Sequence, residues 1–192
     1  KCPWCDSAGT WHPEWTPMDV DKILPDALAE DAGRSNCEIV VLTGGEPTIH
    51  DLTDLTRELA DRELPIHVET CGGYPFQGHF DWVTLSPKWW QLPLDENLQR
   101  ADELKIIVED TESIAKWETE LEGRHTSKHI WLNPEWTQVK NPDVLNSISD
   151  WVKTHGKPYR AGYQMHKVYD VDRRDPGSRP LVPLGGDPAK GY

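Results

Sequence analysis

The 192-residue sequence lacks long apolar runs and contains little cysteine. No run approaches the roughly 18 apolar residues that indicate a membrane span, and the lysine-headed start has no apolar stretch like that of a signal peptide. The four cysteines are Cys2, Cys5, Cys37 and Cys71, whereas secreted disulfide scaffolds are usually shorter and richer in cysteine. These absences favour a cytoplasmic protein whose thiols do chemistry and do not form crosslinks.

Basic residues are also scarce, with 20 Lys and Arg against 33 Asp and Glu and a formal net charge of -13. Such a charge repels a phosphate backbone, which argues against nucleic-acid binding as the main activity. Any anionic ligand must therefore be held by local positive groups. The acidity fits a well-solvated surface or a salt-rich cytosol, because net charge bears on solubility and not on fold.

Short apolar runs alternate with helical patterns along the chain. The run 39–42 is β-branched and ends at glycines, as is typical of a strand buried on both faces of a parallel sheet. The alternation predicts an α/β fold with a mostly parallel sheet, whose ligands gather at the carboxyl ends of the strands. The patterns predict strands at 39–42, 66–69, 82–85, 104–108, 129–132 and 160–164, and helices near 17–31, 50–63, 112–122 and 142–154.

The length fits one domain, but it is short of the roughly 250 residues of a complete eightfold barrel. From about Tyr169 the composition shifts to Asp, Arg, Pro and Gly with little periodicity. We therefore expect a domain at 1–168 and an irregular tail at 169–192.

Cys2 and Cys5 follow the Cys-x-x-Cys spacing, which places two thiolates one turn apart. The spacing suits zinc, a redox disulfide or two corners of an iron-sulfur cluster. A redox pair calls for a thioredoxin-like unit, and a zinc site calls for a second Cys or His pair. The sequence offers neither companion, so the motif alone leaves all three open.

The turn Thr43–Pro47 follows the first predicted strand. Its two glycines let the backbone approach a ligand, and Glu46 offers an acceptor for an ammonium group. Taken alone, an ordinary strand-to-helix turn explains these residues more simply.

Together the two motifs are far more specific than either one. Cys2–Ser7 followed about forty residues later by Thr43–Pro47 resembles the radical S-adenosylmethionine (SAM) superfamily. Within it, four later segments resemble the 7-carboxy-7-deazaguanine synthase family, in the same order and at suitable intervals, over roughly residues 2–168. These segments are Glu69–Gly72, Leu85–Lys88, Glu103–Lys105 and Gln164–Lys167.

The resemblance implies a partial (β/α) barrel of radical SAM type that binds a 4Fe-4S cluster through three cysteines. Cys2 and Cys5 would be two of these, and the third, with the first strand, would lie upstream of Lys1. Three thiolates leave one iron open, which the amino and carboxylate groups of SAM occupy in the superfamily. Cys71 stands where the family usually has asparagine, and neither it nor Cys37 is expected to bind the cluster.

The same resemblance implies the remaining site residues. Ser7 stands where threonine is common and would bind Mg²⁺, although it could simply cap the following turn. Thr43, His166 and Lys167 would bind the substrate, and the last two suit its carboxylate. The residues expected to bind SAM are Gly44, Gly45 and Glu46 at its methionine end, and Glu69, Thr70, Ser86, Lys88 and Asn133 at its ribose or carboxylate.

The implied activity is a cytoplasmic lyase that converts 6-carboxy-5,6,7,8-tetrahydropterin to 7-carboxy-7-deazaguanine with loss of ammonia. SAM is regenerated, Mg²⁺ assists, a flavodoxin or ferredoxin supplies the electron, and a homodimer is expected. Two features depart from the family: an upstream substrate-binding arginine is absent, and the tail is longer than in some relatives.

Two alternatives remain open at this stage. A glycyl-radical-activating enzyme, or another radical SAM enzyme, would also need the cysteine pair and the glycine turn. It explains less of Ser86–Lys88 and Gln164–Lys167. A non-catalytic zinc-binding module would use Cys2 and Cys5 as half of a structural site.

Overall fold

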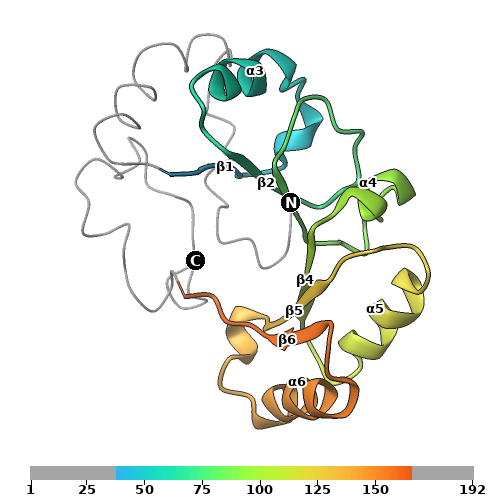
Figure 1. Cartoon of the computed structure of the whole chain (residues 1–192). Coiled ribbons are helices and arrows are strands. Elements are labelled where there is room, and N and C mark those ends of the chain that lie inside the picture. Colours follow the sequence, from blue (N-terminus) through green and yellow to red (C-terminus); the bar gives the residue numbers. More distant parts are fainter. Residues whose placement is uncertain (1–37, 166–192) are drawn as a thin grey trace, which may run out of the picture.

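The computed structural model describes residues 38–165, and its strands form one sheet in chain order (Figure 1). Every neighbouring pair of strands is parallel, which confirms the predicted α/β fold and parallel sheet. The strands are β1 (Val40–Leu42), β2 (Ile66–Thr70), β3 (Trp82–Leu85), β4 (Glu103–Val108), β5 (His129–Pro134) and β6 (Tyr159–Ala161).

Four α-helices lie between or beside these strands and follow one another along one side of the sheet (Figure 1). They are α3 (Thr53–Asp61), α4 (Asp95–Arg100), α5 (Ser113–Leu121) and α6 (Pro142–His155). The 3-10 turn η3 (Pro47–Ile49) lies between β1 and α3, and η4 (Trp136–Gln138) lies between β5 and α6. Three expected helices are confirmed, and the one near 17–31 lies outside the described residues. Sequence patterns missed α4 because six residues carry less than two turns of helical period. None of the described helices is long and apolar enough to cross a membrane.

The sheet has two chemically different faces because side chains alternate along each strand. In β2, Ile66, Val68 and Thr70 are buried, whereas His67 is half-buried and Glu69 is exposed. The buried side chains join the core under the helices. We call the opposite face, which carries His67 and Glu69, the inner face.

Two predicted strands differ from the structure. The run 39–42 was expected to be buried on both faces, but 50% of Val41 is exposed. Val41 pairs with His67 on the inner face, and no described helix covers that face. The last strand ends at Ala161 and not at Gln164.

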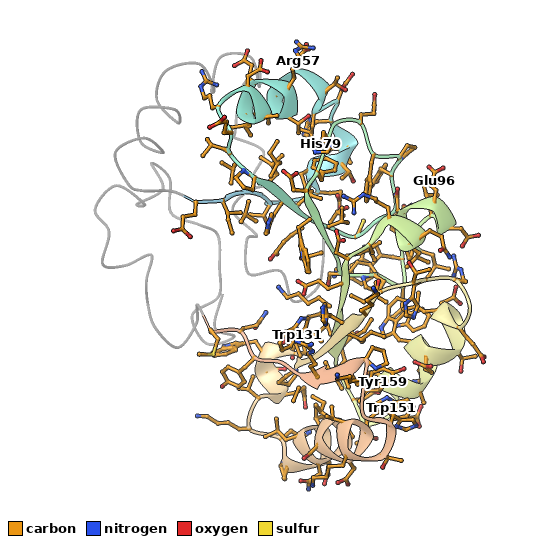
Figure 2. The ribbon with its side chains drawn as sticks, in the orientation of Figure 1. Arg57, His79, Glu96, Trp131, Trp151 and Tyr159 are labelled. Carbon is orange, nitrogen blue, oxygen red and sulfur yellow. The ribbon has the colours of Figure 1, made fainter. Side chains whose placement is uncertain are left out.

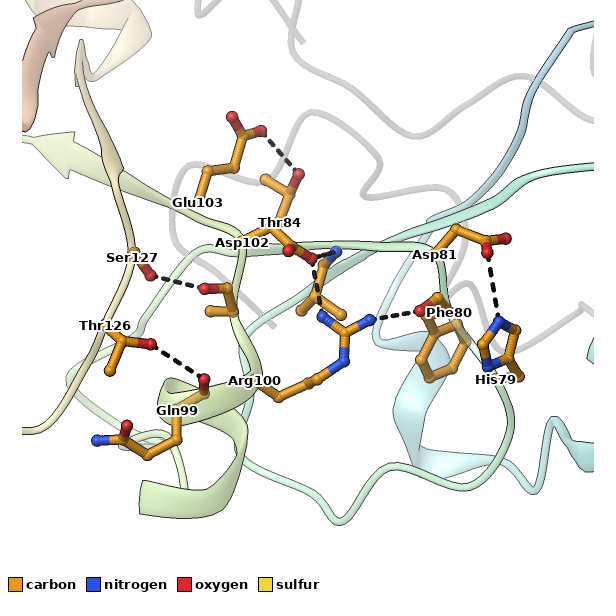
Figure 3. A network of polar contacts seen from close by, with 12 residues as sticks. His79, Phe80, Asp81, Thr84, Gln99, Arg100, Asp102, Glu103, Thr126 and Ser127 are labelled. Atoms are coloured by element: carbon orange, nitrogen blue, oxygen red, sulfur yellow. Dashed lines mark hydrogen bonds and ion pairs between the residues drawn. The ribbon is translucent and has the colours of Figure 1, made fainter.

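Charged side chains fasten the amino ends of β3 and β4 to each other (Figure 3). Arg100 donates to Phe80 O and, at 2.8 Å, to Asp102 Oδ2. The same Asp102 oxygen accepts from the amide of Val83 at 2.8 Å. These contacts hold the amino ends of β3 and β4 in place. The carboxyl ends of the strands, at the opposite edge of the sheet, are free of them.

Candidate functional site

The carboxyl ends of β1 to β6 meet along one edge of the sheet, which we call the carboxyl edge. The turns that follow the first strands contact one another: Thr70 donates to Glu46 at 2.6 Å, and the amide of Ser86 donates to Thr70 O at 2.8 Å. Further along, Gly162 lies against Asn133. The ends of β1, β2 and β3 are therefore joined to one another, and the ends of β5 and β6 are joined further along the same edge.

Several hydrogen bonds fix the side chain of Glu46 at this edge. Its Oε1 accepts from the amide of Thr48 at 3.2 Å and from the hydroxyls of Thr48 and Thr70, each at 2.6 Å. Its Oε2 accepts from the amide of Cys71 at 2.7 Å. Glu46 also caps the 3-10 turn Pro47–Ile49. The carboxylate is fixed from both sides, by its own turn and by the end of β2.

These hydrogen bonds set the charge of Glu46. Partial burial favours the neutral acid, but the donors from Cys71, Thr48 and Thr70 outweigh it, so the pKa of Glu46 is lowered. The side chain remains half-buried. The carboxyl edge thus presents a fixed negative charge beside a glycine turn.

Gly44 gives the turn before Glu46 its shape. Its φ of +128° is one that side chains rarely adopt, and a Cβ placed there would meet no atom of residues 38–165 within 4 Å. The backbone is therefore open to a ligand at this point. Gly72 is different, because its φ of +75° accompanies close packing against Leu85.

Cys71 directly follows β2 and is half-buried. Burial, and then its hydrogen bond and charge repulsion with Glu46, raise the pKa of this thiol to about 12. A thiol that stays protonated is a poor metal ligand and nucleophile.

Positive charge reaches the edge through Lys88. Its Nζ donates to Ser86 O at 2.8 Å and to Ser86 Oγ at 2.6 Å, which folds the turn after β3 around the ammonium. At the end of β4, burial and the nearby carboxylates Asp110 and Glu135 raise the pKa of Glu109, and Lys88 opposes that rise.

Asn133 and Glu135 lie at the carboxyl end of β5. Asn133 is 4% exposed, and a Cβ on Gly162 would lie 2.1 Å from its Oδ1, so only glycine permits this approach. Glu135 accepts from the amide of Thr137 at 2.9 Å through Oε2. Its Oε1 has no hydrogen-bond partner among the described residues.

The inner face adds a second set of polar side chains. Glu69 Oε2 lies 3.7 Å from Lys105 Nζ. Glu103 accepts from Thr84 Oγ1 and Trp131 Nε1, both at 2.8 Å. Figure 2 shows Trp131 apart from Trp151 and Tyr159, which group beside α6 on the helix side.

The structure thus brings together most of the expected SAM-binding residues. At the carboxyl edge lie Gly44, Gly45, Glu46, Thr70, Ser86, Lys88 and Asn133, while Glu69 lies on the inner face. Thr43, which is expected to bind the substrate, lies at the same edge. Thr70 and Asn133 are each 4% exposed, which leaves little of either side chain for a ligand. Cys2, Cys5, Ser7, His166 and Lys167 lie outside the described residues.

Sequence reasoning missed Thr48. It is 2% exposed and donates twice to Glu46. No clear sequence signal pointed to it, because the residue that caps this turn is Glu46, and glutamate is not among the residues preferred at such caps. The contributions of Glu109, Glu135 and Lys105 depend on contacts between strands, which a single sequence does not display.

Comparison with known proteins gives consistent results. No protein-family model matches the chain. The chain is 37% identical over 177 residues to a 7-carboxy-7-deazaguanine synthase of Synechocystis sp., covering 88% of this chain and 78% of that protein. It is 32% identical over 170 residues to the enzyme of the same name from Flavobacterium psychrophilum, covering 88% and 77%. A crystal structure of QueE from Escherichia coli superposes with a TM-score of 0.64 at 27% identity, covering 85% of this chain and 79% of that one.

Proposed function

Since this chain belongs to the 7-carboxy-7-deazaguanine synthase family of radical SAM lyases, we propose that its carboxyl edge holds SAM against a pterin substrate. The reaction is the conversion of 6-carboxy-5,6,7,8-tetrahydropterin to 7-carboxy-7-deazaguanine with loss of ammonia. The observation that carries the assignment of the SAM site is the fixed and ionised carboxylate of Glu46 beside the open backbone at Gly44.

The residues of the edge fit the amino and carboxylate groups at the methionine end of SAM. Glu46 accepts a hydrogen bond from the amino group of the methionine part, and the lowered pKa of Glu46 keeps its carboxylate ionised for that role. Lys88 and Ser86 bind the methionine carboxylate. Thr70 acts through Glu46, since its buried hydroxyl already donates to that carboxylate.

Glu69 serves the ribose in this proposal. A carboxylate only accepts hydrogen bonds, so it suits hydroxyl donors and not the SAM carboxylate. Its side chain is 45% exposed on the inner face, which leaves it accessible. Asn133 and Gly162 shape the wall of the site at the end of β5.

Cys2 and Cys5 hold the 4Fe-4S cluster, and thiolates are the usual ligands of such clusters. The bound cluster and SAM supply the one-electron chemistry, and the protein fixes their geometry. Thr43, His166 and Lys167 bind the pterin. A cation at His166 and Lys167 suits the pterin carboxylate.

Three further parts complete the proposal. Ser7 binds Mg²⁺ through its hydroxyl, a hard donor of the kind that this ion prefers. A flavodoxin or ferredoxin supplies the electron. The protein works as a homodimer in the cytoplasm.

The test is turnover by the reconstituted protein. Supplied anaerobically with dithionite, SAM and 6-carboxytetrahydropterin, it should yield 7-carboxy-7-deazaguanine by mass spectrometry, and faster with Mg²⁺ than with a chelator. The Ser7→Ala variant should lose that acceleration.

The outcomes separate the parts of the proposal. Cleavage of SAM without deazaguanine would remove the pterin substrate and leave SAM binding in place. Equal turnover of Ser7→Ala with and without Mg²⁺, alongside an accelerated parent protein, would support the metal role. Equal turnover of the parent protein in both conditions would remove it.

A further inference from the structure

An ion pair on the inner face crosses a whole strand. Lys105 Nζ in β4 lies 3.7 Å from Glu69 Oε2 in β2, although β3 runs between these two strands. Glu69 is in register with Thr84 of β3, and Thr84 is in register with Glu103 of β4. Lys105 lies two residues further along β4, on the same face as Glu103, so the pair runs diagonally towards the carboxyl edge.

Such a pair needs two long side chains and a small residue beneath them. Neighbouring strands lie about 4.8 Å apart, so β2 and β4 are about 10 Å apart and both side chains must lean over β3. Thr84 supplies the small residue. The Thr84 hydroxyl donates to Glu103 at 2.8 Å, which keeps this side chain close to the sheet.

Two other charged side chains of the inner face, Glu103 and Arg160, have partners other than Glu69 and Lys105. Glu103 also accepts from Trp131 Nε1 at 2.8 Å, and the guanidinium of Arg160 lies 5.4 Å from the centre of the Trp131 ring. These contacts hold Glu103 and Arg160 near β5 and β6. Lys105 is thus the cation that the sheet directs to Glu69.

We propose that Lys105 is a positioning residue for SAM, which it serves by holding one oxygen of Glu69 so that the other points to a ribose hydroxyl. This inference rests on the proposed function, in which Glu69 binds the ribose. The pair itself adds little to folding, because 30% of the Lys105 side chain and 45% of the Glu69 side chain are exposed. We therefore assign the ion pair the role of orienting the Glu69 carboxylate.

Binding of SAM to the cluster-loaded protein, measured by calorimetry, tests the inference. Lys105→Met should weaken SAM binding about tenfold, because Glu69 would lose the cation that orients it toward the ribose. Lys105→Arg, which keeps the cation, should stay within about threefold of the parent protein. Lys116→Met is the matched control, because Lys116 pairs with Glu112 on α5 outside the site and should leave SAM binding unchanged.

A double variant separates positioning from direct contact. In a Glu69→Gln background, Lys105→Met should cause no further loss of SAM affinity, because the residue that it positions has already changed. A further tenfold loss would overturn the inference and make Lys105 an independent contact. Unchanged affinity in Lys105→Met alone would also overturn it.

The thermal unfolding midpoints of the Lys105 and Lys116 variants should match, which excludes a general loss of structure as the cause. These measurements do not depend on turnover. If the parent protein binds and cleaves SAM but makes no deazaguanine, the proposed reaction fails while this inference is still decided by SAM affinity.

Discussion

Thr70 Oγ1 donates to Glu46 Oε1 at 2.6 Å and accepts from the amide of Gly72 at 2.9 Å. One buried hydroxyl therefore joins the turn after β1 to the turn after β2. Because it touches the carboxylate and no exposed surface, its effect on a ligand must pass through Glu46.

Thr70→Val removes this link and should weaken SAM binding several-fold. The free energy of unfolding should fall by about 1–3 kcal/mol, because a hydrogen bond to a charged group is lost and the Gly72 amide loses its acceptor. Thr56→Val is the control. Thr56 is 1% exposed, donates to Leu52 O at 2.8 Å and accepts from the His79 amide at 3.0 Å. It should lose similar stability and keep SAM affinity, so an equal loss of affinity in both variants would refute the link.

Glu46→Gln should weaken SAM binding while the iron content stays unchanged, because the lost carboxylate is the stronger acceptor for the amino group of SAM. The same variant should also make the free energy of unfolding less dependent on pH in the acid range. The folded-state pKa of Glu46 is lowered from 4.5, so its ionised form stabilises the fold above about pH 4.5, and this stabilisation disappears as the pH falls through the folded-state value. Denaturation at pH 7 and pH 3 should show a stability gap between parent and variant that shrinks in acid. A gap that grows in acid would contradict the ionised state of Glu46.

Replacing either Cys2 or Cys5 with Ala should abolish the broad visible absorption near 400 nm that a reconstituted cluster shows. Within residues 38–165 the sheet begins at β1, well after both cysteines, so circular dichroism of the variants should change little. Full iron and sulfide content in either variant would remove that cysteine from the ligand set.

Local patterns predicted most of the fold but less of the site. The strand at 82–85 and the helical spacing before His155 were predicted correctly, because each pattern lies within one segment. The role of Lys105 could not be read, since its partner is 36 positions away on a strand that does not neighbour its own. The same holds for Thr70, whose hydroxyl meets Glu46 only once β1 and β2 pair in register.

The Cys71 thiol should react slowly with iodoacetamide. Its pKa is raised from 9.0 to about 12, so the thiolate fraction at pH 8 falls about a thousandfold. Peptide mass spectrometry of the native protein should show little alkylation of Cys71, with rapid alkylation after denaturation. Glu46→Gln should speed the native reaction, because it removes the neighbouring negative charge, while burial still slows it. Fast labelling of the native parent protein would show that Cys71 is ionised.

Gly162→Ala should disturb the wall of the site. The new Cβ would lie 2.1 Å from Asn133 Oδ1 and 2.9 Å from its Cγ, and Asn133 is too buried to move aside freely. Overpacking of this kind typically costs about 1–3 kcal/mol of unfolding free energy, and the displaced amide should lower SAM affinity several-fold.

Asn133→Ala provides the decisive comparison for that clash. Because it deletes the atoms that the new methyl group meets, adding Gly162→Ala to Asn133→Ala should cost far less stability than adding it to the parent protein. Chemical denaturation of the four proteins measures this coupling. Equal costs in both backgrounds would mean that Gly162 is needed for its backbone alone, and the close approach of β6 to Asn133 would then have no part in shaping the site.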